Sequence, residues 1–212
     1  MTTLEEISEW LQKGRAPKVK AAVTKALEEG IPAATILQDG LLAGMDIIGA
    51  KFKNNEVFVP EVLVAARAMS RGVDVLQPYL VDAGVEDAGT VILGTVKGDM
   101  HDIGKNLVRM MMEGKGIKVI DLGVDVPVEN FLDAAREHDA KIICCSALLT
   151  TTMGEMKNVV DAVNASELKG NVKIMIGGAP ITQTFCEQIG ADCYTPDAAS
   201  AADAALKFCK EM

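Results

Sequence analysis

Five short apolar runs that alternate with helical segments are the feature that most constrains the fold of this chain. Helical patterns separate these runs, with uncertain ends, at 104–114, 127–137, 152–165, 181–189 and 197–210. The runs themselves are TVILGTV, IKVIDLG, AKIICCSAL, VKIMIGG and ADCYT, all between residues 90 and 195. Short buried strands that alternate with helices form parallel sheets covered on both faces. We therefore expect a doubly wound α/β domain with a five-stranded parallel sheet.

The first 83 residues carry a different pattern, with apolar side chains spaced three and four residues apart. The clearest stripe is Val59, Val62, Ala66, Met69, Val73, Leu76 and Leu80. Helices with one apolar face and short connections pack as an antiparallel bundle. The segment AGVEDAG that follows is small, acidic and unpatterned. We expect an all-α four-helix bundle over 1–83, a linker at 84–90 and the α/β domain over 91–212.

Charge and composition exclude several classes of partner. The net charge of -9 and the pI near 4.8 disfavour nucleic-acid binding, which requires clustered Lys and Arg. The N-terminus MTTLEEISEW has no apolar signal-peptide core, and we expect no run of transmembrane length. The five cysteines lack a C-x-x-C pair and are typical of reduced, mostly buried residues. These features predict a cytoplasmic protein with neither nucleic-acid nor membrane partners.

The residues that follow the predicted strands indicate where a ligand would bind. In open α/β sheets, ligands bind beyond the carboxyl ends of the strands, where the strand order reverses. His101 follows the first strand between Asp99 and Asp102, Ser146 follows the third, and Gly177–Gly178 follow the fourth. The fold would bring these distant residues to one edge of the sheet.

A single histidine allows several interpretations. It can be a loop residue that merely hydrogen-bonds a neighbouring Asp. A zinc site built by the protein needs three or four protein ligands, and no such spacing is present. Haem and corrinoids bring their own equatorial ligands and need one axial donor, but the haem motif C-x-x-C-H is absent. A corrinoid whose tail is displaced from cobalt also needs a slot between strand ends. Small residues available for that slot are Gly94, Ser146, Ala147, Gly177, Gly178 and Ala179.

Three motifs carry a family resemblance. Asp99-x-His101-x-x-Gly104, Ser146-x-Leu148 and Gly177–Gly178 together resemble the D-x-H-x-x-G…S-x-L…G-G fingerprint of cobalamin-binding domains. The segment NNEVFVPEVLVAARAM is similar to the cap domain of methionine synthase and of small corrinoid methyl-carrier proteins. The resemblance covers nearly the whole chain, and the combination of motifs is highly specific. It implies a helical cap followed by a flavodoxin-like, Rossmann-like cobalamin domain.

The resemblance also implies roles for individual residues. His101 would be the lower axial ligand of cobalt in a base-off/His-on cobalamin, and Asp99 would accept a hydrogen bond from its imidazole. Gly104 would let the next helix start close to the cofactor. Phe58 would lie in the cap over the upper face, the alternative being a bundle core position. The implied cofactor-binding residues are Gly98, Asp99, Met100, His101, Asp102, Ile103, Gly104, Ser146, Leu148, Thr150, Gly177, Gly178, Ala198 and Phe58, with His101 as the metal ligand.

Within this set, the residues implied to hold the nucleotide tail have structural alternatives. Ser146 and Thr150 would hydrogen-bond the tail's base, or serve only as strand-end and helix-cap residues. Gly177 and Gly178 would make room for the tail, or form a plain turn between strand and helix. Ala198 matches a further tail contact. Outside the set, Met110–Met112 are interpreted as helix core and His138 as a surface residue.

The function that the resemblance implies is methyl transfer by a carrier subunit. Such a protein receives a methyl group on cobalt from a substrate:corrinoid methyltransferase. A methylcorrinoid:acceptor methyltransferase then passes the methyl group to tetrahydrofolate or a thiol. We expect no enzyme activity from this chain alone, because no residues remain for a substrate-binding barrel, and we expect a reductive activase as a further partner. The alternatives are a cobalamin subunit of an adenosylcobalamin-dependent isomerase and a cobalamin-sensing regulator. Methanol, methylamines, quaternary amines and aryl methyl ethers all stay open as methyl donors.

Overall fold

The computed structural model describes residues 2–82 and 88–212 and shows two units. The helical unit comprises Met1–Glu86 with Gly114–Gly116, and the α/β unit comprises Asp87–Glu113 with Ile117–Met212. Of the linker predicted at 84–90, residues 84–87 lie outside the described residues, and Thr90 is the first residue of a strand.

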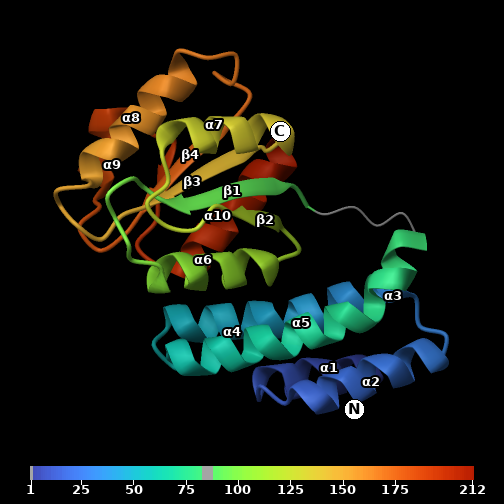
Figure 1. Ribbon diagram of the computed structural model, residues 1–212. Helices are drawn as coiled ribbons and strands as arrows, with labels where there is room; N and C mark the ends of the chain where they lie inside the picture. The colour runs from blue at the N-terminus through green and yellow to red at the C-terminus, as the bar shows by residue number, and fades with distance from the viewer. Residues whose placement is uncertain (1, 83–87) are drawn as a thin grey trace. The chain divides into compact units, whose positions relative to one another are not determined.

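The helical unit contains the predicted antiparallel bundle. Its elements are α1 (Thr3–Gln12), α2 (Ala16–Glu28), α3 (Ala33–Thr35), η1 (Ile36–Leu42), α4 (Ala43–Lys53) and α5 (Val59–Asp82). The segments α3, η1 and α4 follow one another without a break, so they act as one helix beside α1, α2 and α5 (Figure 1). The four-helix prediction is confirmed. The seven-residue π-helical segment η1 was not predicted.

Local sequence explains how these helices begin and pack. The Thr2 hydroxyl accepts a hydrogen bond from the Glu5 amide, and the Glu5 carboxylate accepts one from the Thr2 amide. This capping box satisfies amide groups that the first turn of a helix leaves free. A Cβ at Gly40 would lie 3.2 Å from the Ile7 side chain, so the glycine lets η1 approach α1 closely.

The continuous run Ala33–Lys53 corrects one expectation. It has 21 residues, and an 18-residue window within it has a mean hydropathy of 1.2, so by length and composition alone it is long and apolar enough to cross a membrane. The apolar side chains of Ile36, Leu41, Met45 and Ile48 are buried inside the helical unit, as in a core helix. The expectation that no run reaches transmembrane length is therefore wrong. The run is nevertheless packed as one helix of the bundle.

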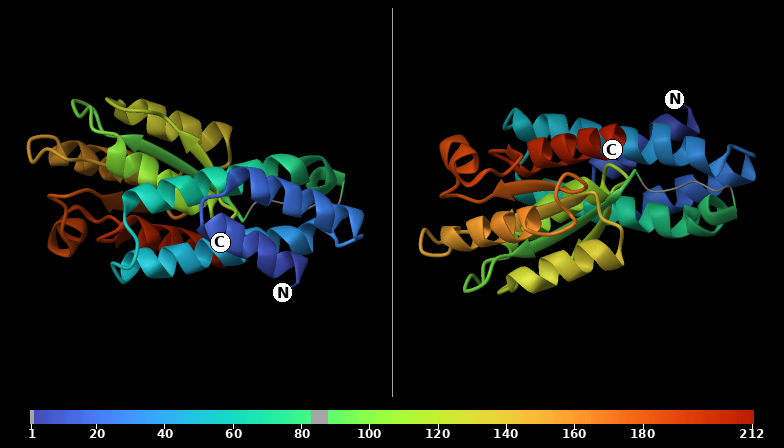
Figure 2. Two further views of the ribbon diagram at one scale, coloured as in Figure 1. Left: turned by 90° about the horizontal axis from the view of Figure 1, so that it is seen from below. Right: turned by 90° about the horizontal axis from the view of Figure 1, so that it is seen from above.

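The α/β unit contains the predicted five-stranded sheet, and all of its strands are parallel. The strands are β1 (Thr90–Thr95), β2 (Lys118–Asp121), β3 (Ile142–Ser146), β4 (Lys173–Gly177) and β5 (Cys193–Tyr194). The helices are α6 (Ile103–Glu113), α7 (Val128–Glu137), α8 (Met153–Asn164), α9 (Gln183–Ile189) and α10 (Ala198–Glu211). The helices α6 and α10 cover one face of the sheet, and α7 and α8 cover the other (Figures 1 and 2).

In the strand order β2-β1-β3-β4-β5, β2 is added on one side of β1 and β3 to β5 are added on the other side. The strand order therefore reverses between β1 and β3. The register aligns Thr95 with Ser146 and Ser146 with Gly177, so the carboxyl ends of β1, β3 and β4 lie level. Ligands bind at such an edge in doubly wound folds. The predicted site residues on the loops after these strands are thus brought to one edge.

The core around β1 confirms some predictions and corrects another. Val91, Ile92 and Leu93 are all buried, as expected for a strand covered on both faces. A Cβ at Gly94 would lie 2.8 Å from the Phe131 ring, so this glycine accommodates α7 and gives no room to a ligand. The proposal of Gly94 for the slot is therefore wrong. Met111 and Met112 are buried in α6, as predicted.

The cysteines behave as the composition predicted. All five are free, with Cys193 half-buried and the other four buried. Burial raises the pKa of the Cys145 thiol to about 12, so this group stays a neutral, apolar core residue at physiological pH.

Candidate functional site

The Asp99 carboxylate is the centre of the candidate site and is 0% exposed to solvent. Its Oδ1 accepts hydrogen bonds from the His101 amide (3.1 Å) and from the His101 ring Nδ1 (2.8 Å). Its Oδ2 accepts from the amides of Leu148 (2.8 Å) and Leu149 (3.1 Å) and from the Thr152 hydroxyl (2.8 Å). One carboxylate therefore ties the loop after β1 to the loop after β3.

These contacts keep Asp99 ionised. Burial alone would raise the pKa of the carboxyl, but the hydrogen bonds from His101, Leu148, Thr152 and Leu149 outweigh it. The pKa of Asp99 consequently lies well below its usual range. A carboxylate that is ionised throughout the physiological pH range can only accept hydrogen bonds.

The ionised carboxylate determines what the His101 ring can do. Nδ1 must carry a hydrogen to donate to Asp99, so the neutral imidazole has its free lone pair on Nε2. The side chain of His101 is 49% exposed, which leaves the ring accessible. A hydrogen bond from the ring nitrogen that does not bind the metal to a carboxylate orients metal-ligating histidines and strengthens them as donors. His101 thus offers one oriented nitrogen to a ligand.

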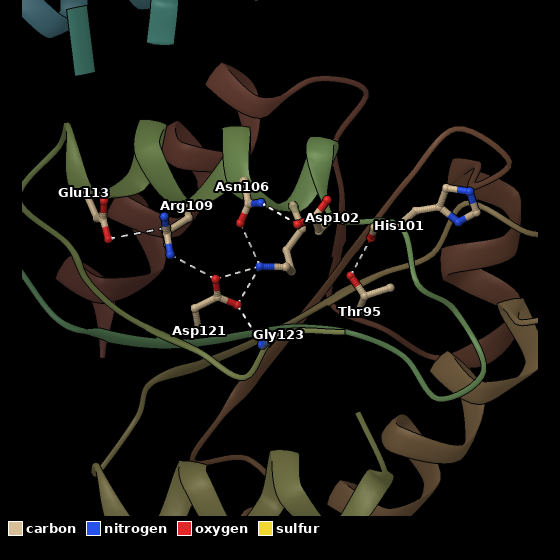
Figure 3. Close-up of polar contacts among 9 residues, drawn as sticks. Thr95, His101, Asp102, Asn106, Arg109, Glu113, Asp121 and Gly123 are labelled. Atoms are coloured by element: carbon tan, nitrogen blue, oxygen red, sulfur yellow. Dashed lines mark hydrogen bonds and ion pairs between the residues drawn. The ribbon is translucent and has the colours of Figure 1, made fainter. Parts of the chain in front are cut away.

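The backbone of His101 is also held. Its carbonyl oxygen accepts a hydrogen bond from the buried Thr95 hydroxyl at 2.9 Å. Figure 3 shows the Thr95 side chain next to this carbonyl, with the imidazole directed away from the charged residues around Asp121. His101 is therefore held both at its backbone carbonyl and at the Nδ1 atom of its ring.

Large apolar side chains surround this histidine in the sequence and at the neighbouring strand end. Met100 is 68% exposed and Ile103 is 79% exposed, and Leu148 and Leu149 are exposed to a smaller extent, at 43% and 40%. Exposed apolar side chains that gather in one place mark binding surfaces. A single nitrogen donor among apolar side chains suits a broad apolar ligand that carries its own metal. Among residues 2–82 and 88–212, no group of three or more His, Cys, Asp or Glu could hold a metal ion.

The predicted glycines at this edge play different parts. A Cβ at Gly104 or Gly177 would meet no atom within 4 Å, so both positions border open space. A Cβ at Gly178 would lie 1.8 Å from the Ala147 carbonyl oxygen, and its φ is +137°. Gly178 is therefore required by the turn itself, while Gly177 leaves space beside the end of β3. Gly98 has a φ of +80°.

The remaining predicted residues lie at the same edge of the sheet or on the helical unit. Ser146 is the half-buried last residue of β3, Thr150 is exposed in the loop that follows, and Ala198 is the buried first residue of α10. Asp102 does not contact the imidazole and instead accepts a hydrogen bond from the Asn106 side chain at 3.0 Å. On the helical unit, Phe58 is 63% exposed, so it is not a bundle core residue.

A second carboxylate, Asp121, lies half-buried at the end of β2 and was not predicted from the sequence. Lys105 Nζ lies 2.6 and 2.7 Å from its two oxygens, and Arg109 donates to it at 3.1 Å (Figure 3 shows Asp121 with Arg109). Burial raises the pKa of Asp121, but the contacts with Lys105, Gly123 and Arg109 lower it by more, so the pKa lies below its usual value. The available signal was an acidic residue at the end of a strand together with Lys105 and Arg109, which lie one helical turn apart on the preceding helix.

Comparisons with known proteins identify relatives over nearly the whole chain. Residues 89–206 match the family model described as a B12 binding domain, and residues 3–77 match a second B12 binding domain model. Dimethylamine corrinoid protein 3 of Methanosarcina acetivorans is 40% identical over 198 residues, which cover 93% of this chain and 92% of that protein. A corrinoid protein of Desulfitobacterium hafniense is 37% identical over 211 residues, which cover 98% of each chain.

Two solved structures are similar in both fold and length. A cobalamin-binding protein from Desulfitobacterium hafniense superposes with a TM-score of 0.82 at 29% identity, covering 98% of this chain and 99% of the other. A chain in the methanol:cobalamin methyltransferase complex MtaBC from Methanosarcina barkeri has a TM-score of 0.84 at 28% identity, covering 99% of this chain and 83% of the other.

Proposed function

This chain belongs to the B12-binding family of corrinoid proteins, and from that premise we propose that it carries a methyl group on cobalamin between two methyltransferases. The observation that supports this role best is the Asp99–His101 pair. The buried carboxylate holds Nδ1 and leaves Nε2 as a single exposed donor among apolar side chains. Bound cobalamin would supply a cobalt ion on which a methyl group can be held.

The residues present fit such a cofactor. The apolar side chains of Met100, Ile103 and Leu148 offer a surface for a broad macrocycle around one nitrogen. The space at Gly177, where a Cβ would meet nothing, lies next to Ser146 and suits a tail that enters between strand ends. We propose that His101 binds cobalt in place of the tail's own base, as the base-off/His-on form requires.

Further residues of the site are proposed on the same basis. Ser146 and Thr150 would hydrogen-bond the tail, Gly177 would leave it room, and Ala198 would contact it. Gly178 would contribute by shaping the turn beside the tail, because its Cβ position is closed by Ala147. Gly98 and Asp102 would shape the loop 96–102 between β1 and α6, called the histidine loop, and Gly104 would shape the start of α6.

Phe58 is proposed to shield the methyl group on the upper face of the cofactor. Its ring is exposed in the helical unit and is available for a ligand contact. With Phe58→Ala, we expect corrinoid binding to persist and light to cleave the methyl–cobalt bond faster. Tyr79→Ala is the matched control, because Tyr79 is an exposed aromatic at the other end of α5. Equal photolysis rates in the two variants would contradict the role of Phe58.

The proposed partners follow from the chemistry and from the relatives. Relatives named for dimethylamine suggest that a methyltransferase acting on a methylated amine supplies the methyl group. A second methyltransferase would transfer it to tetrahydrofolate or a thiol, and a reductive activase would restore oxidised cobalt. We propose that the chain works as a cytoplasmic carrier subunit and that both transfer reactions take place in partner enzymes.

Electron paramagnetic resonance of the cobalt(II) protein tests the central assignment. The protein is reconstituted anaerobically with cobalamin after growth with unlabelled or ¹⁵N-labelled histidine. We expect the nitrogen splitting to change from a triplet to a doublet on labelling, because the histidine nitrogen binds cobalt. His101→Ala should lose the change, whereas His138→Ala, which alters the one other histidine, should keep it. A triplet unaffected by labelling would assign the ligand to the cofactor's own base and refute the proposal.

A further inference from the structure

The loop between β2 and α7 is hydrogen-bonded to the end of β1, the strand that leads to the histidine loop. The Thr95 amide donates to the Gly123 carbonyl at 3.0 Å, and the Val126 amide donates to the Thr95 carbonyl at 2.9 Å. These bonds continue the pairing of β1 and β2 beyond the strands themselves. The β2–α7 loop is therefore held against the segment that leads to His101.

Asp125, in the middle of this loop, makes two further contacts with the histidine loop. Its amide donates to the Asp99 carbonyl oxygen at 2.9 Å. Its carboxylate oxygen Oδ1 accepts a hydrogen bond from the Gly98 amide at 2.6 Å. One residue thus serves as both donor and acceptor for two consecutive residues, Gly98 and Asp99.

Asp125 adopts an unusual backbone conformation to make these contacts. Its φ is +52°, in the left-handed region that residues other than glycine seldom occupy. Asp and Asn tolerate that region better than other residues with a Cβ. Strained backbone conformations persist where the surrounding structure requires them, and they cluster at functional sites.

The strand order gives these contacts their significance. Because β1 lies between β2 and β3, Asp99 is held by the loops that follow both neighbouring strands. The β3–α8 loop binds its carboxylate through the Leu148 and Leu149 amides, and the β2–α7 loop binds its backbone through Asp125. The Asp99 amide also donates to the Val96 carbonyl at 3.1 Å, so Asp125 adds the contact that holds the Asp99 carbonyl from the neighbouring loop.

We propose that Asp125 is a positioning residue that sets the direction in which His101 presents Nε2 to the metal of the bound cofactor. The inference rests on the proposed function for the identity of that cofactor. Asp125 acts by fixing Gly98 and Asp99, and it does not touch the ligand. Metal ligands must be held within about 0.5 Å of their working geometry, so support at the backbone of Asp99 affects the cobalt–nitrogen bond.

Three variants separate the carboxylate from the backbone conformation. Asp125→Gly keeps the left-handed conformation accessible and removes the acceptor for Gly98. Asp125→Asn keeps an oxygen acceptor and tolerates the same φ. Asp139→Gly is the matched control, because Asp139 also has a positive φ (+47°) but follows α7 and lies outside these loops.

The first measurement uses the cofactor-free protein. Hydrogen exchange of the Gly98 amide, followed by NMR, should be about tenfold or more faster in Asp125→Gly, because a hydrogen bond to a charged group is lost. Asp125→Asn and Asp139→Gly should exchange within a few-fold of the unaltered protein. Equal exchange in Asp125→Gly and Asp139→Gly would overturn the proposed contact.

The second measurement uses the same variants loaded with cobalamin in the cobalt(II) state. Asp125→Gly should retain the cofactor but show a smaller histidine-bound fraction and broadened nitrogen splitting, whereas Asp125→Asn and Asp139→Gly should match the unaltered protein. Unchanged splitting in Asp125→Gly would overturn the positioning role. If the unaltered protein itself shows no histidine splitting, the proposed function fails, and faster Gly98 exchange in Asp125→Gly would still support the loop contact.

Discussion

Asp99 and Asp121 are carboxylates at the same edge of the sheet, the first fully buried and the second half-buried, and their partners differ in kind. Asp121 is paired with Lys105 and Arg109, two side chains that carry permanent positive charges. Asp99 is held by three backbone amides, a hydroxyl and one imidazole. The pKa of each carboxyl lies below its usual range despite burial.

The difference in partners separates a structural ion pair from a functional site. The charge of Asp121 is neutralised within the α/β unit, so nothing further is required of its surroundings. When His101 is neutral, all the donors to Asp99 are uncharged. The negative charge of Asp99 therefore favours the binding of a positively charged metal ion at Nε2 of His101. A carboxylate of this second kind is suited to a histidine that binds a metal ion.

The largest effect is expected from breaking the structural pair. Lys105→Met leaves the half-buried Asp121 without its main partner, and removing one member of a buried pair costs up to about 3–5 kcal/mol. Urea unfolding of the cofactor-free protein would measure this loss. Lys207→Met, which removes an exposed pair with Glu211, should change the free energy of unfolding by less than about 1 kcal/mol.

The comparison requires that Lys105→Met acts on stability and leaves the histidine in place. Variant protein that is still folded and loaded should keep the nitrogen splitting from His101. Loss of that splitting at unchanged stability would mean that the two carboxylates are not separate in function.

Asp99→Asn should produce the next largest effect, on metal binding. The amide has the size of the carboxylate but lacks the charge and the second acceptor, so His101 loses orientation and donor strength. Changes to the hydrogen-bond partner of a metal ligand typically reduce affinity or activity about 10–100-fold. Cobalamin titration and the nitrogen splitting would measure the loss. Asp133→Asn is the matched control, because Asp133 is an exposed carboxylate on α7 outside the site, and an equal loss there would contradict the assignment.

The sheet and the centre of the site were predictable because their signals lie in short segments. Each strand is a continuous apolar run, and Asp99 lies two residues before His101 in one motif. Thr152 was missed because its bond to Asp99 spans 53 residues, and the run Thr150–Thr152 offers three similar hydroxyls. Asp125 was missed because its role depends on a left-handed backbone and on a neighbouring loop.

The two carboxylates should also shape the dependence of stability on acid. A carboxyl whose pKa is lowered by folding stabilises the protein above its unfolded pKa, and that contribution is lost as pH falls toward the folded pKa. Below about pH 4 the unfolded chain therefore binds more protons, and the free energy of unfolding decreases. Removing one such group should reduce the slope by at most about 1.4 kcal/mol per pH unit.

Urea unfolding of the cofactor-free protein between about pH 4 and pH 2 tests this expectation. Asp99→Asn should have a flatter acid limb than the unaltered protein. Asp133→Asn, at an exposed carboxylate on α7, should retain the original slope. A parallel decline in Asp99→Asn and the unaltered protein would contradict the lowered pKa of Asp99.

The smallest expected effect comes from the hydroxyl of Thr152, which has two acceptors for one hydrogen. Its Oγ1 lies 2.8 Å from Asp99 Oδ2 and 2.9 Å from the Leu149 carbonyl oxygen. The ionised oxygen is the stronger acceptor, so we place the hydrogen on the bond to Asp99. Thr152→Val keeps the shape and removes this bond, while Oδ2 retains its two amide donors. The loss should therefore be only about 0.5–1.5 kcal/mol in the free energy of unfolding.

Thr152→Ser, which keeps the hydroxyl, and Thr151→Val, at the exposed neighbouring position, are the matched controls. Because Asp99 transmits the change to His101, Thr152→Val should also weaken the cobalt–histidine bond slightly, whereas a hydrogen bonded to the Leu149 carbonyl would affect stability alone. Unfolding and nitrogen splitting measured on the same three variants distinguish these cases. A stability loss in Thr152→Val without any change at cobalt would remove Thr152 from the functional site and leave Asp99 with its amide donors and His101.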